Sequence, residues 1–171
     1  PVGLLLRWAL NRANVHVHLQ NEDDRTTLRR AGVLRHDRVS IIRGAGVDLD
    51  HFAPLPEPDG PITVAMAARM IHEKGIGDLV EAARRATRAG TPVKVVLAGA
   101  PDTGNPTAIT EAELRSWAAE GLVDWWGFQT DVRKVWAAAH VAALPSSGEG
   151  LPKALLEAAS CRRALLATDV A

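Results

Sequence analysis

From residue 62 to the end of the chain, short apolar runs alternate with segments of helical periodicity. This alternation is typical of βαβ units, in which parallel strands are covered by helices on both faces. Most of the runs are apolar without interruption, as expected for strands buried on both sides. The pattern predicts five strands, at residues 62–67, 93–98, 123–126, 141–144 and 164–168.

The segments between these runs carry apolar residues at helical spacing. They predict helices near residues 77–89, 111–119, 131–139 and 151–160. The last has an apolar stripe at Leu151, Ala154, Leu155, Ala158 and Ala159. The expected fold class is therefore α/β, a Rossmann-like parallel sheet with helices on both faces. Residues 100–110 form an insertion of turn residues after the second strand, and long loops of this kind are more often functional than idle.

The first 52 residues follow a different pattern, which predicts a partial second α/β unit. Its elements are an apolar helix near residues 4–10, a strand at 15–19, a polar helix after Asn21 and a strand at 40–43. We expect Asn21 to be the N-cap of its helix, because acidic residues follow it at the positive end of the helix dipole.

Residues 53–61 contain four prolines, which exclude both helix and sheet. We therefore expect three parts: a unit at 1–52, a linker at 53–61 and a main domain at 62–171. The predicted helix at the start of the chain is apolar from its first residues, and the last predicted strand is followed by no helix that could cover it. We expect a piece of a longer protein, truncated at the C-terminus. The apolar side chains of the first helix would then lack their partners: Leu4, Leu5, Leu6, Trp8 and Leu10.

Composition narrows the classes of function. Lys and Arg together number 20, as do Asp and Glu, so the formal net charge is zero, which argues against a nucleic-acid partner. The 171 residues are 47% apolar, enough for a substantial core. No stretch approaches the roughly 18 apolar residues of a membrane span. The single cysteine, Cys161, excludes an internal disulfide and makes the reducing cytosol the default compartment.

Metal binding is not expected. Asp48 and Asp50 form an Asp-x-Asp pair, but carboxylate pairs of this kind are common at protein surfaces. His16 and His18 alternate along a predicted strand, so we expect their rings to point to opposite faces of the sheet.

Candidate chemistry lies after the first strand of the main domain. The ligand crevice of a parallel sheet lies beyond the carboxyl ends of its strands, where helix N-termini also point. Arg69 and Lys74-Gly75 follow the first strand and would supply two cations and a flexible turn to a diphosphate. Taken alone, such loop charges are ordinary.

A second group of residues follows the fourth strand. Two glycines flank Glu149 ahead of a predicted helix whose second residue is Pro152, a favoured helix start. Free backbone amides can hold an anion, and Glu149 can accept hydrogen bonds from hydroxyls, so the loop suits a phosphorylated sugar. Glu157, taken alone, reads as a surface residue paired with Lys153 at i, i+4.

In combination, these motifs resemble the nucleotide-sugar-binding domain of the family-4 (group 1) glycosyltransferases of GT-B architecture. The two main matches are Arg69-x4-Lys74-Gly75 and Leu144-Pro145-Ser146-x2-Glu149-Gly150-Leu151-Pro152-x4-Glu157-Ala158, with Glu149 and Glu157 as the family's Glu-x7-Glu pair. Similar stretches extend the likeness over nearly the whole chain: Arg43-Gly44-x-Gly46-Val47-Asp48-x2-His51-Phe52, Asp131-Val132 and Ala139-His140-Val141. Three others are similar to the branch that extends bacterial surface polysaccharides on lipid-linked acceptors: Asn21-Glu22-Asp23-Asp24, Gly104-Asn105-Pro106 and Trp125-Trp126-Gly127.

The resemblance implies retaining transfer of a sugar from a nucleotide diphosphate donor, a UDP-sugar, to a saccharide or lipid-linked saccharide in polysaccharide biosynthesis. It implies three catalytic residues, of which Arg69 and Lys74 neutralise the diphosphate and Glu149 contacts the donor sugar. Glu157 would bind the ribose. The implied binding set also includes Gly75, Gly148, Gly150 and Leu151. The resemblance requires no metal or other cofactor, and it implies a cytoplasmic protein, peripherally associated with the inner face of the membrane at full length.

The chain departs from the family pattern at Cys161-Arg162-Arg163, where a small residue and glycine are usual. The resemblance makes residues 1–52 a remnant of the family's N-terminal, acceptor-side domain and residues 62–171 its nucleotide-sugar-binding, or donor, domain. The family's glycine-rich acceptor loop and catalytic-side histidine lie outside these residues, so we expect donor binding without transfer from this chain alone. Two alternatives stay open. A nucleotide-sugar epimerase of the same architecture would need a different set of carboxylates and histidines. A Rossmann-like regulatory module would need an acidic cluster where Arg69 and Lys74 stand.

Overall fold

The computed structural model describes residues 2–44 and 46–170. Contacts group the chain into two compact units. The larger comprises Val47–Glu149 and Lys153–Val170, and the smaller comprises the residues up to Gly46 together with Gly150–Pro152. The division into an acceptor-side remnant, a linker and a donor domain stays a prediction.

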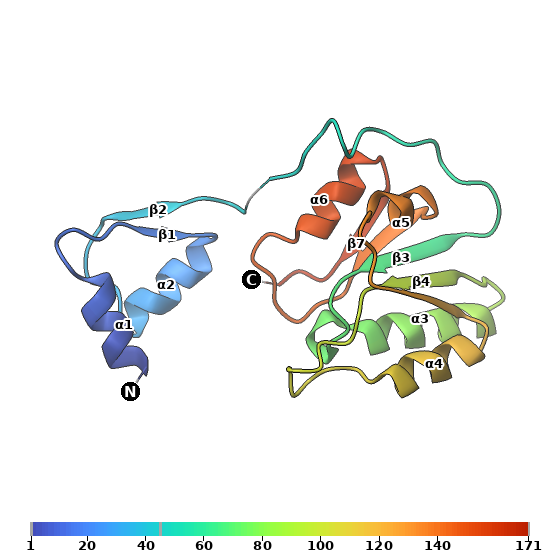
Figure 1. The fold of residues 1–171 in the computed structure, drawn as a ribbon, viewed down its shortest axis with the longest axis horizontal. Helices are drawn as coiled ribbons and strands as arrows, with labels where there is room; N and C mark the ends of the chain where they lie inside the picture. Colours follow the sequence, from blue (N-terminus) through green and yellow to red (C-terminus); the bar gives the residue numbers. More distant parts are fainter. Residues whose placement is uncertain (1, 45, 171) are drawn as a thin grey trace. The chain divides into compact units, whose positions relative to one another are not determined.

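The larger unit is built on a parallel sheet in the order β5-β4-β3-β6-β7 (Figure 1). Its strands are β3 (Thr63–Ala67), β4 (Lys94–Ala98), β5 (Val123–Gly127), β6 (Val141–Leu144) and β7 (Ala164–Ala167). All five predicted strands are present, with ends that differ by at most one residue. β3 lies at the centre, where Val64 pairs with Val95 of β4 on one side and with Val141 of β6 on the other. The strand order changes direction at β3, and ligands of such folds bind at this point.

Helices cover both faces of this sheet (Figure 1). They are α3 (Ile76–Arg88) and α4 (Glu111–Ala119) on one face, and α5 (Arg133–Ala137) and α6 (Lys153–Ser160) on the other, with a short 3₁₀ turn, η1 (His72–Lys74), before α3. The predicted fold class is therefore confirmed. The expected helix start is wrong, because α6 begins at Lys153 and Pro152 precedes the helix instead of standing second in it.

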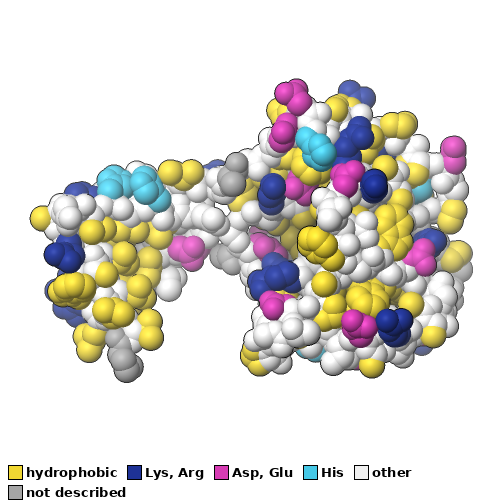
Figure 2. Space-filling view, in the orientation of Figure 1, with side chains coloured by type: hydrophobic (Ala, Val, Ile, Leu, Met, Phe, Trp, Pro, Cys, Tyr) yellow, Lys and Arg dark blue, Asp and Glu magenta, His cyan; other side chains and the backbone are white. Residues whose placement is uncertain are grey.

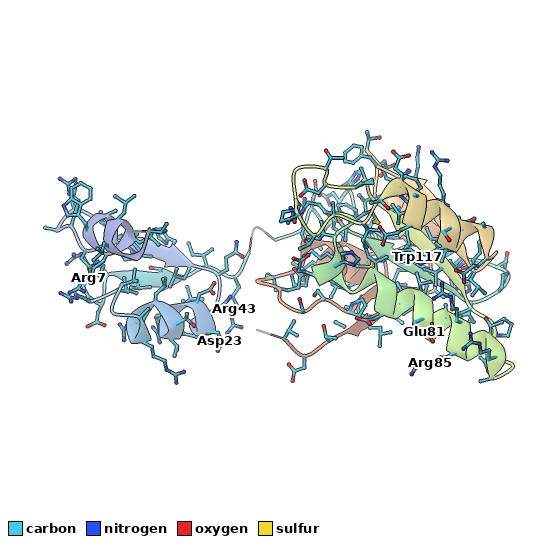
Figure 3. All side chains as sticks on the ribbon, turned by 90° about the horizontal axis from the view of Figure 1, so that it is seen from below. Arg7, Asp23, Arg43, Glu81, Arg85 and Trp117 are labelled. Carbon is cyan, nitrogen blue, oxygen red and sulfur yellow. The ribbon has the colours of Figure 1, made fainter. Side chains whose placement is uncertain are left out.

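Each face of the sheet has its own apolar core. Between the sheet and α3 and α4 lie fully buried side chains that include Met66, Ile76, Val80, Leu97 and Leu114. Trp117 of α4 packs partly buried against this cluster (Figure 3). On the other face, the buried set includes Val135, Trp136, Ala142, Ala158 and Cys161. Helices with apolar faces on both sides explain why β3, β4 and β6 are largely apolar and buried. The expectation of burial on both sides is wrong for β7, which is exposed along its length.

The turn between α6 and β7 contains the departure from the family pattern. Arg162 adopts a left-handed conformation with φ of 60°, which glycine adopts without strain. Arg163 is only 5% exposed, and its guanidinium donates hydrogen bonds to four backbone carbonyls. These belong to Leu55, Pro56, Ala139 and Cys161. The buried guanidinium thus fastens part of the proline-rich segment to the ends of two helices.

The smaller unit consists of α1 (Val2–Leu10), β1 (Val17–Leu19), α2 (Glu22–Arg30) and β2 (Val39–Ile41), with β1 and β2 parallel. Asn21 is confirmed as the N-cap of α2, since its side chain accepts a hydrogen bond of 2.6 Å from the amide of Asp24. Hydrophobic side chains are visible on the surface of this unit in Figure 2. On α1 the exposed ones are Leu4, Leu5, Leu6 and Trp8. Among the described residues, no helix has the length and apolar character needed to cross a membrane.

Candidate functional site

A pocket of about 420 Å³ opens in the larger unit at the carboxyl ends of β3, β4 and β5, beside α6. Small residues at the ends of β3 and β4 make up much of its lining: Ala67, Ala68, Ala98, Gly99 and Ala100. Because these side chains are short or absent, a flat ligand can approach the backbone closely. The pocket lies at the edge of the sheet where ligands of such folds bind.

Two of the predicted site residues, Arg69 and Glu157, line this pocket. The Arg69 side chain is 63% exposed, and its Nη1 donates to Oδ2 of Asp102 at 2.7 Å. Glu157 lies 3.4 Å from Nζ of Lys153, so the predicted i, i+4 pair is present. The expectation that Glu157 is a surface residue is wrong, because it is only 7% exposed. A carboxylate at the wall of a pocket is suited to accept hydrogen bonds from ligand hydroxyls.

Lys74 and Glu149 form an ion pair and are not among the residues that line this pocket. Lys74 ends η1, and Glu149 lies in the loop after β6. Their Nζ and Oε1 atoms are 2.5 Å apart, and both side chains are largely buried. Pairing of β3 with β6 brings the loops that follow these strands together, although the two residues are far apart in the sequence.

Contacts between loops hold this ion pair in place. Gly75 has a φ of 71°, and a Cβ added there would overlap the carbonyl oxygen of Pro145, so the position requires glycine. The amide of Ser147 donates to the carbonyl of Glu73 at 2.9 Å. The Thr107 hydroxyl donates to the Glu73 carboxylate, and this hydrogen bond lowers the pKa of Glu73. Three loops are thereby joined around Lys74.

The other predicted binding residues follow β6. Gly148 is exposed in the same loop as Glu149. Gly150 and Leu151 come next in the chain, and their contacts group them with the smaller unit. The larger unit brings the predicted residues together in two pairs. Arg69 and Glu157 line the pocket, while Lys74 and Glu149 form an ion pair beside Gly75.

Among the polar and aromatic residues that line the pocket, three were not identified from the sequence: Asp102, Phe128 and Gln129. Phe128 follows β5 and is 73% exposed, which is unusual for an aromatic ring. Gln129 donates its side-chain amide to the carbonyl of Trp126 at 2.7 Å. Asp102 lies in the insertion at residues 100–110, and the length of this loop was the only feature of the sequence that indicated a functional role there. For Phe128, the sequence offered only its position directly after the Trp125-Trp126-Gly127 stretch.

Within residues 2–44 and 46–170, no three His, Cys, Asp or Glu side chains are grouped so that they could hold a metal ion. The expectation that His16 and His18 point to opposite faces is wrong, since their ring centroids are 5.0 Å apart. Side chains two residues apart in extended backbone lie on the same face, which brings the two rings together. The Asp48 carboxylate accepts hydrogen bonds from the backbone amides of His51 and Asp50, which lower the pKa of Asp48. Asp48 therefore stabilises a turn.

Comparison with known protein families supplies the identity. Residues 61–171 match the family described as "Glycosyl transferases group 1". The chain belongs to this family. Membership confirms the resemblance drawn from the motifs around Arg69, Lys74, Glu149 and Glu157, and it favours glycosyl transfer over the epimerase and regulatory alternatives.

The relatives of this group 1 glycosyltransferase chain include enzymes whose names give different substrates or products. It is 27% identical over 162 residues to the N,N'-diacetylbacillosaminyl-diphospho-undecaprenol alpha-1,3-N-acetylgalactosaminyltransferase of Campylobacter jejuni, covering 87% of the chain and 41% of the relative. It is 29% identical over 181 residues to the alpha-maltose-1-phosphate synthase of Mycolicibacterium smegmatis, covering 96% and 46%. The chain thus spans less than half the length of these relatives.

Solved structures share the fold of this chain. HepE from Anabaena, in complex with UDP and glucose, superposes with a TM-score of 0.76 at 22% identity, covering 98% of the chain and 49% of HepE. Sucrose-phosphate synthase from Thermosynechococcus elongatus gives a TM-score of 0.77 at 21% identity, covering 98% and 44%. These matches confirm the predicted architecture, one half of a GT-B glycosyltransferase.

Proposed function

We propose that the larger unit binds a nucleotide diphosphate sugar, specifically a UDP-sugar, as glycosyl donor. The observation that carries this proposal is the pocket at the strand ends, which combines a lining of small residues, the Arg69 guanidinium and the buried Glu157 carboxylate. HepE, solved with UDP and glucose, supports the choice of nucleotide. The donor requires no metal or further cofactor in this proposal.

Each part of the donor has a chemical counterpart in the unit. The exposed ring of Phe128 offers a surface on which a nucleobase stacks. Glu157 accepts hydrogen bonds from the ribose, and Glu149 accepts them from the sugar. Arg69 and Lys74 bind the diphosphate and stabilise its charge as it leaves. Preorganised positive charge of this kind is what departure of a diphosphate needs most.

We further propose that the full-length protein transfers the sugar with retention to a saccharide or lipid-linked saccharide during polysaccharide biosynthesis. The name of the Campylobacter jejuni relative, which acts on a diphospho-undecaprenol acceptor, supports this class of acceptor. In this proposal residues 62–171 are the donor domain, residues 53–61 the linker and residues 1–52 part of the acceptor side. Transfer would take place in the cytoplasm at the inner face of the membrane, with the cleft closed around both substrates.

Calorimetric titration of the 171-residue chain with UDP, UDP-sugars, GDP and ADP tests donor binding. We expect Arg69→Ala and Lys74→Ala each to weaken UDP binding about tenfold or more, because each removes a charge-assisted contact with the diphosphate. Arg85→Ala is the matched control, since Arg85 lies exposed on α3 (Figure 3). Binding should also weaken with added salt. Unchanged affinity in both site variants would show that the diphosphate binds elsewhere.

The two glutamates can be separated by comparing UDP with a UDP-sugar. If Glu149 meets the sugar, Glu149→Ala weakens binding of the UDP-sugar and spares UDP. If Glu157 meets the ribose, Glu157→Ala weakens both about equally. Each variant loses a hydrogen bond to a carboxylate, worth about 1.5–3 kcal/mol, or roughly tenfold to a hundredfold in affinity. Loss of UDP binding in both variants to the same degree would overturn the assignment of Glu149.

A further inference from the structure

Both cations proposed for the diphosphate already have a carboxylate partner in this structure. The Lys74–Glu149 pair joins two residues of the proposed donor site. Arg69 is paired instead with Asp102, a residue for which neither the family motifs nor the proposed donor contacts provide a role. The question is what this second carboxylate does at a site for an anion.

The backbone around Arg69 is held without the ion pair. Met70 forms a parallel bridge with Pro101, and Ile71 forms an antiparallel bridge with Ala108. The Met70 amide also donates to the carbonyl of Ala100 at 3.1 Å. The segments that carry Arg69 and Asp102 are therefore fastened to each other by backbone hydrogen bonds. Asp102 is not needed to place the arginine backbone.

The contact between the two side chains is also of the kind that breaks easily. It is a single hydrogen bond from Nη1 to Oδ2, and the side chains are 63% and 32% exposed for Arg69 and Asp102, respectively. Exposed ion pairs with one contact add little stability. The guanidinium has five N–H donors in a fork, so an incoming phosphate can engage Arg69 before Asp102 releases it.

Asp102 nevertheless changes the charge of the pocket. The charged residues that line the pocket are one cation, Arg69, and two carboxylates, Asp102 and Glu157. A diphosphate bound to Arg69 would lie near the Asp102 carboxylate, and like charges repel.

We propose that Asp102 competes with the donor diphosphate for Arg69, so that this carboxylate weakens the binding of nucleoside diphosphates and speeds their release. The proposal rests on the proposed function, because it assumes that Arg69 binds the diphosphate. When the diphosphate leaves, Asp102 pairs with Arg69 again, and the released anion meets a guanidinium that is already neutralised. Asp102 therefore acts on the donor through Arg69.

Asp102→Asn tests this role, because asparagine has nearly the same shape and no charge. Calorimetry on the 171-residue chain should show that the variant binds UDP roughly three- to tenfold more tightly, as expected for removing one like charge near a partly exposed site. Uridine, which has no phosphate, should bind both proteins equally. Asp102→Glu, which keeps the charge, should resemble the wild type. In an Arg69→Ala background the Asn substitution should lose most of its gain.

Release can be measured directly with a fluorescently labelled UDP in stopped flow. The Asp102→Asn variant should release the ligand roughly three- to tenfold more slowly, since the affinity gain lies mainly in dissociation. Its thermal unfolding midpoint should match the wild type, which separates competition from a structural role. UDP affinity that is equal or weaker in Asp102→Asn would overturn the role of Asp102 while leaving UDP binding intact. Absence of UDP binding in the wild type would instead overturn the proposed function and this inference with it.

Discussion

Replacing Arg163 by methionine removes the buried guanidinium that joins the proline-rich segment to the ends of α5 and α6. The hydrogen bonds lost are those to Leu55 at 2.7 Å, Pro56 at 2.6 Å, and Ala139 and Cys161 at 3.0 Å. Ala139 and Cys161 lie just after the C-termini of α5 and α6, where helix dipoles favour a cation. Methionine fills similar space but supplies no donor, so the four carbonyls are left without this partner.

The expected loss in the free energy of unfolding follows from the number of hydrogen bonds that Arg163 makes. Each hydrogen bond contributes about 1 kcal/mol net, and an acceptor left buried without a partner costs more, so we expect a loss of about 3–5 kcal/mol. A domain of this kind is stable by roughly 5–15 kcal/mol in total. With a urea dependence of about 2 kcal/mol per molar, the midpoint of unfolding should fall by about 2 M.

Urea unfolding followed by tryptophan fluorescence measures this effect, because four of the five tryptophans belong to the larger unit. The matched control is Arg162→Met, the same chemical change at the exposed neighbouring position, for which we expect a shift within about 0.5 kcal/mol. Arg163→Lys should recover only part of the loss, since one ammonium group cannot reach four carbonyls. Equal midpoints for Arg163→Met and Arg162→Met would refute the reasoning.

Three further outcomes are expected. Arg162→Gly should raise the free energy of unfolding by about 1 kcal/mol in the same urea assay, because glycine adopts the positive φ of this position without strain. Gly75→Ala should weaken UDP binding in calorimetry at least as much as loss of Lys74, since the added Cβ overlaps the Pro145 carbonyl and displaces the turn. Hydrogen bonds from the Thr110 side chain and amide lower the pKa of Glu113, so its contribution is present above the ordinary value of 4.5 and disappears as pH falls. The stability difference between the wild type and Glu113→Gln should therefore shrink in urea titrations between about pH 6 and about pH 3.

The order of strands and helices could be predicted because apolar periodicity reports directly which residues face a core. The residues at which helices and strands begin and end are harder to predict. Leu151 fits the apolar stripe of α6 whether or not its backbone is helical, so periodicity could not show that the helix begins at Lys153. The prediction for His16 and His18 failed for a different reason, because side chains two residues apart in a strand lie on the same face.

Motifs of fixed spacing after a strand could predict that Arg69 lines the pocket and that Lys74 and Glu149 lie close together, while the roles of all three in donor binding stay predictions. The site could not be predicted where a side chain reaches the pocket from a loop of irregular conformation, as for Asp102 and Phe128. The burial of Glu157 depends on how α6 packs beside the strand ends, which spacing within one helix does not reveal. Such features depend on contacts between distant segments.

The central position of β3 also sets the order in which this chain can fold. β3 can pair with β4 early, but its other neighbour, β6, lies much later in the sequence. During synthesis, β3 therefore keeps one edge open until residues 141–144 have been made, and contacts between such distant segments form slowly. The pocket is completed later still, because Arg69 follows β3 and Glu157 belongs to α6, the last described helix of the larger unit. A ribosome that pauses before α6 would thus hold a chain with most of its sheet and an unfinished pocket.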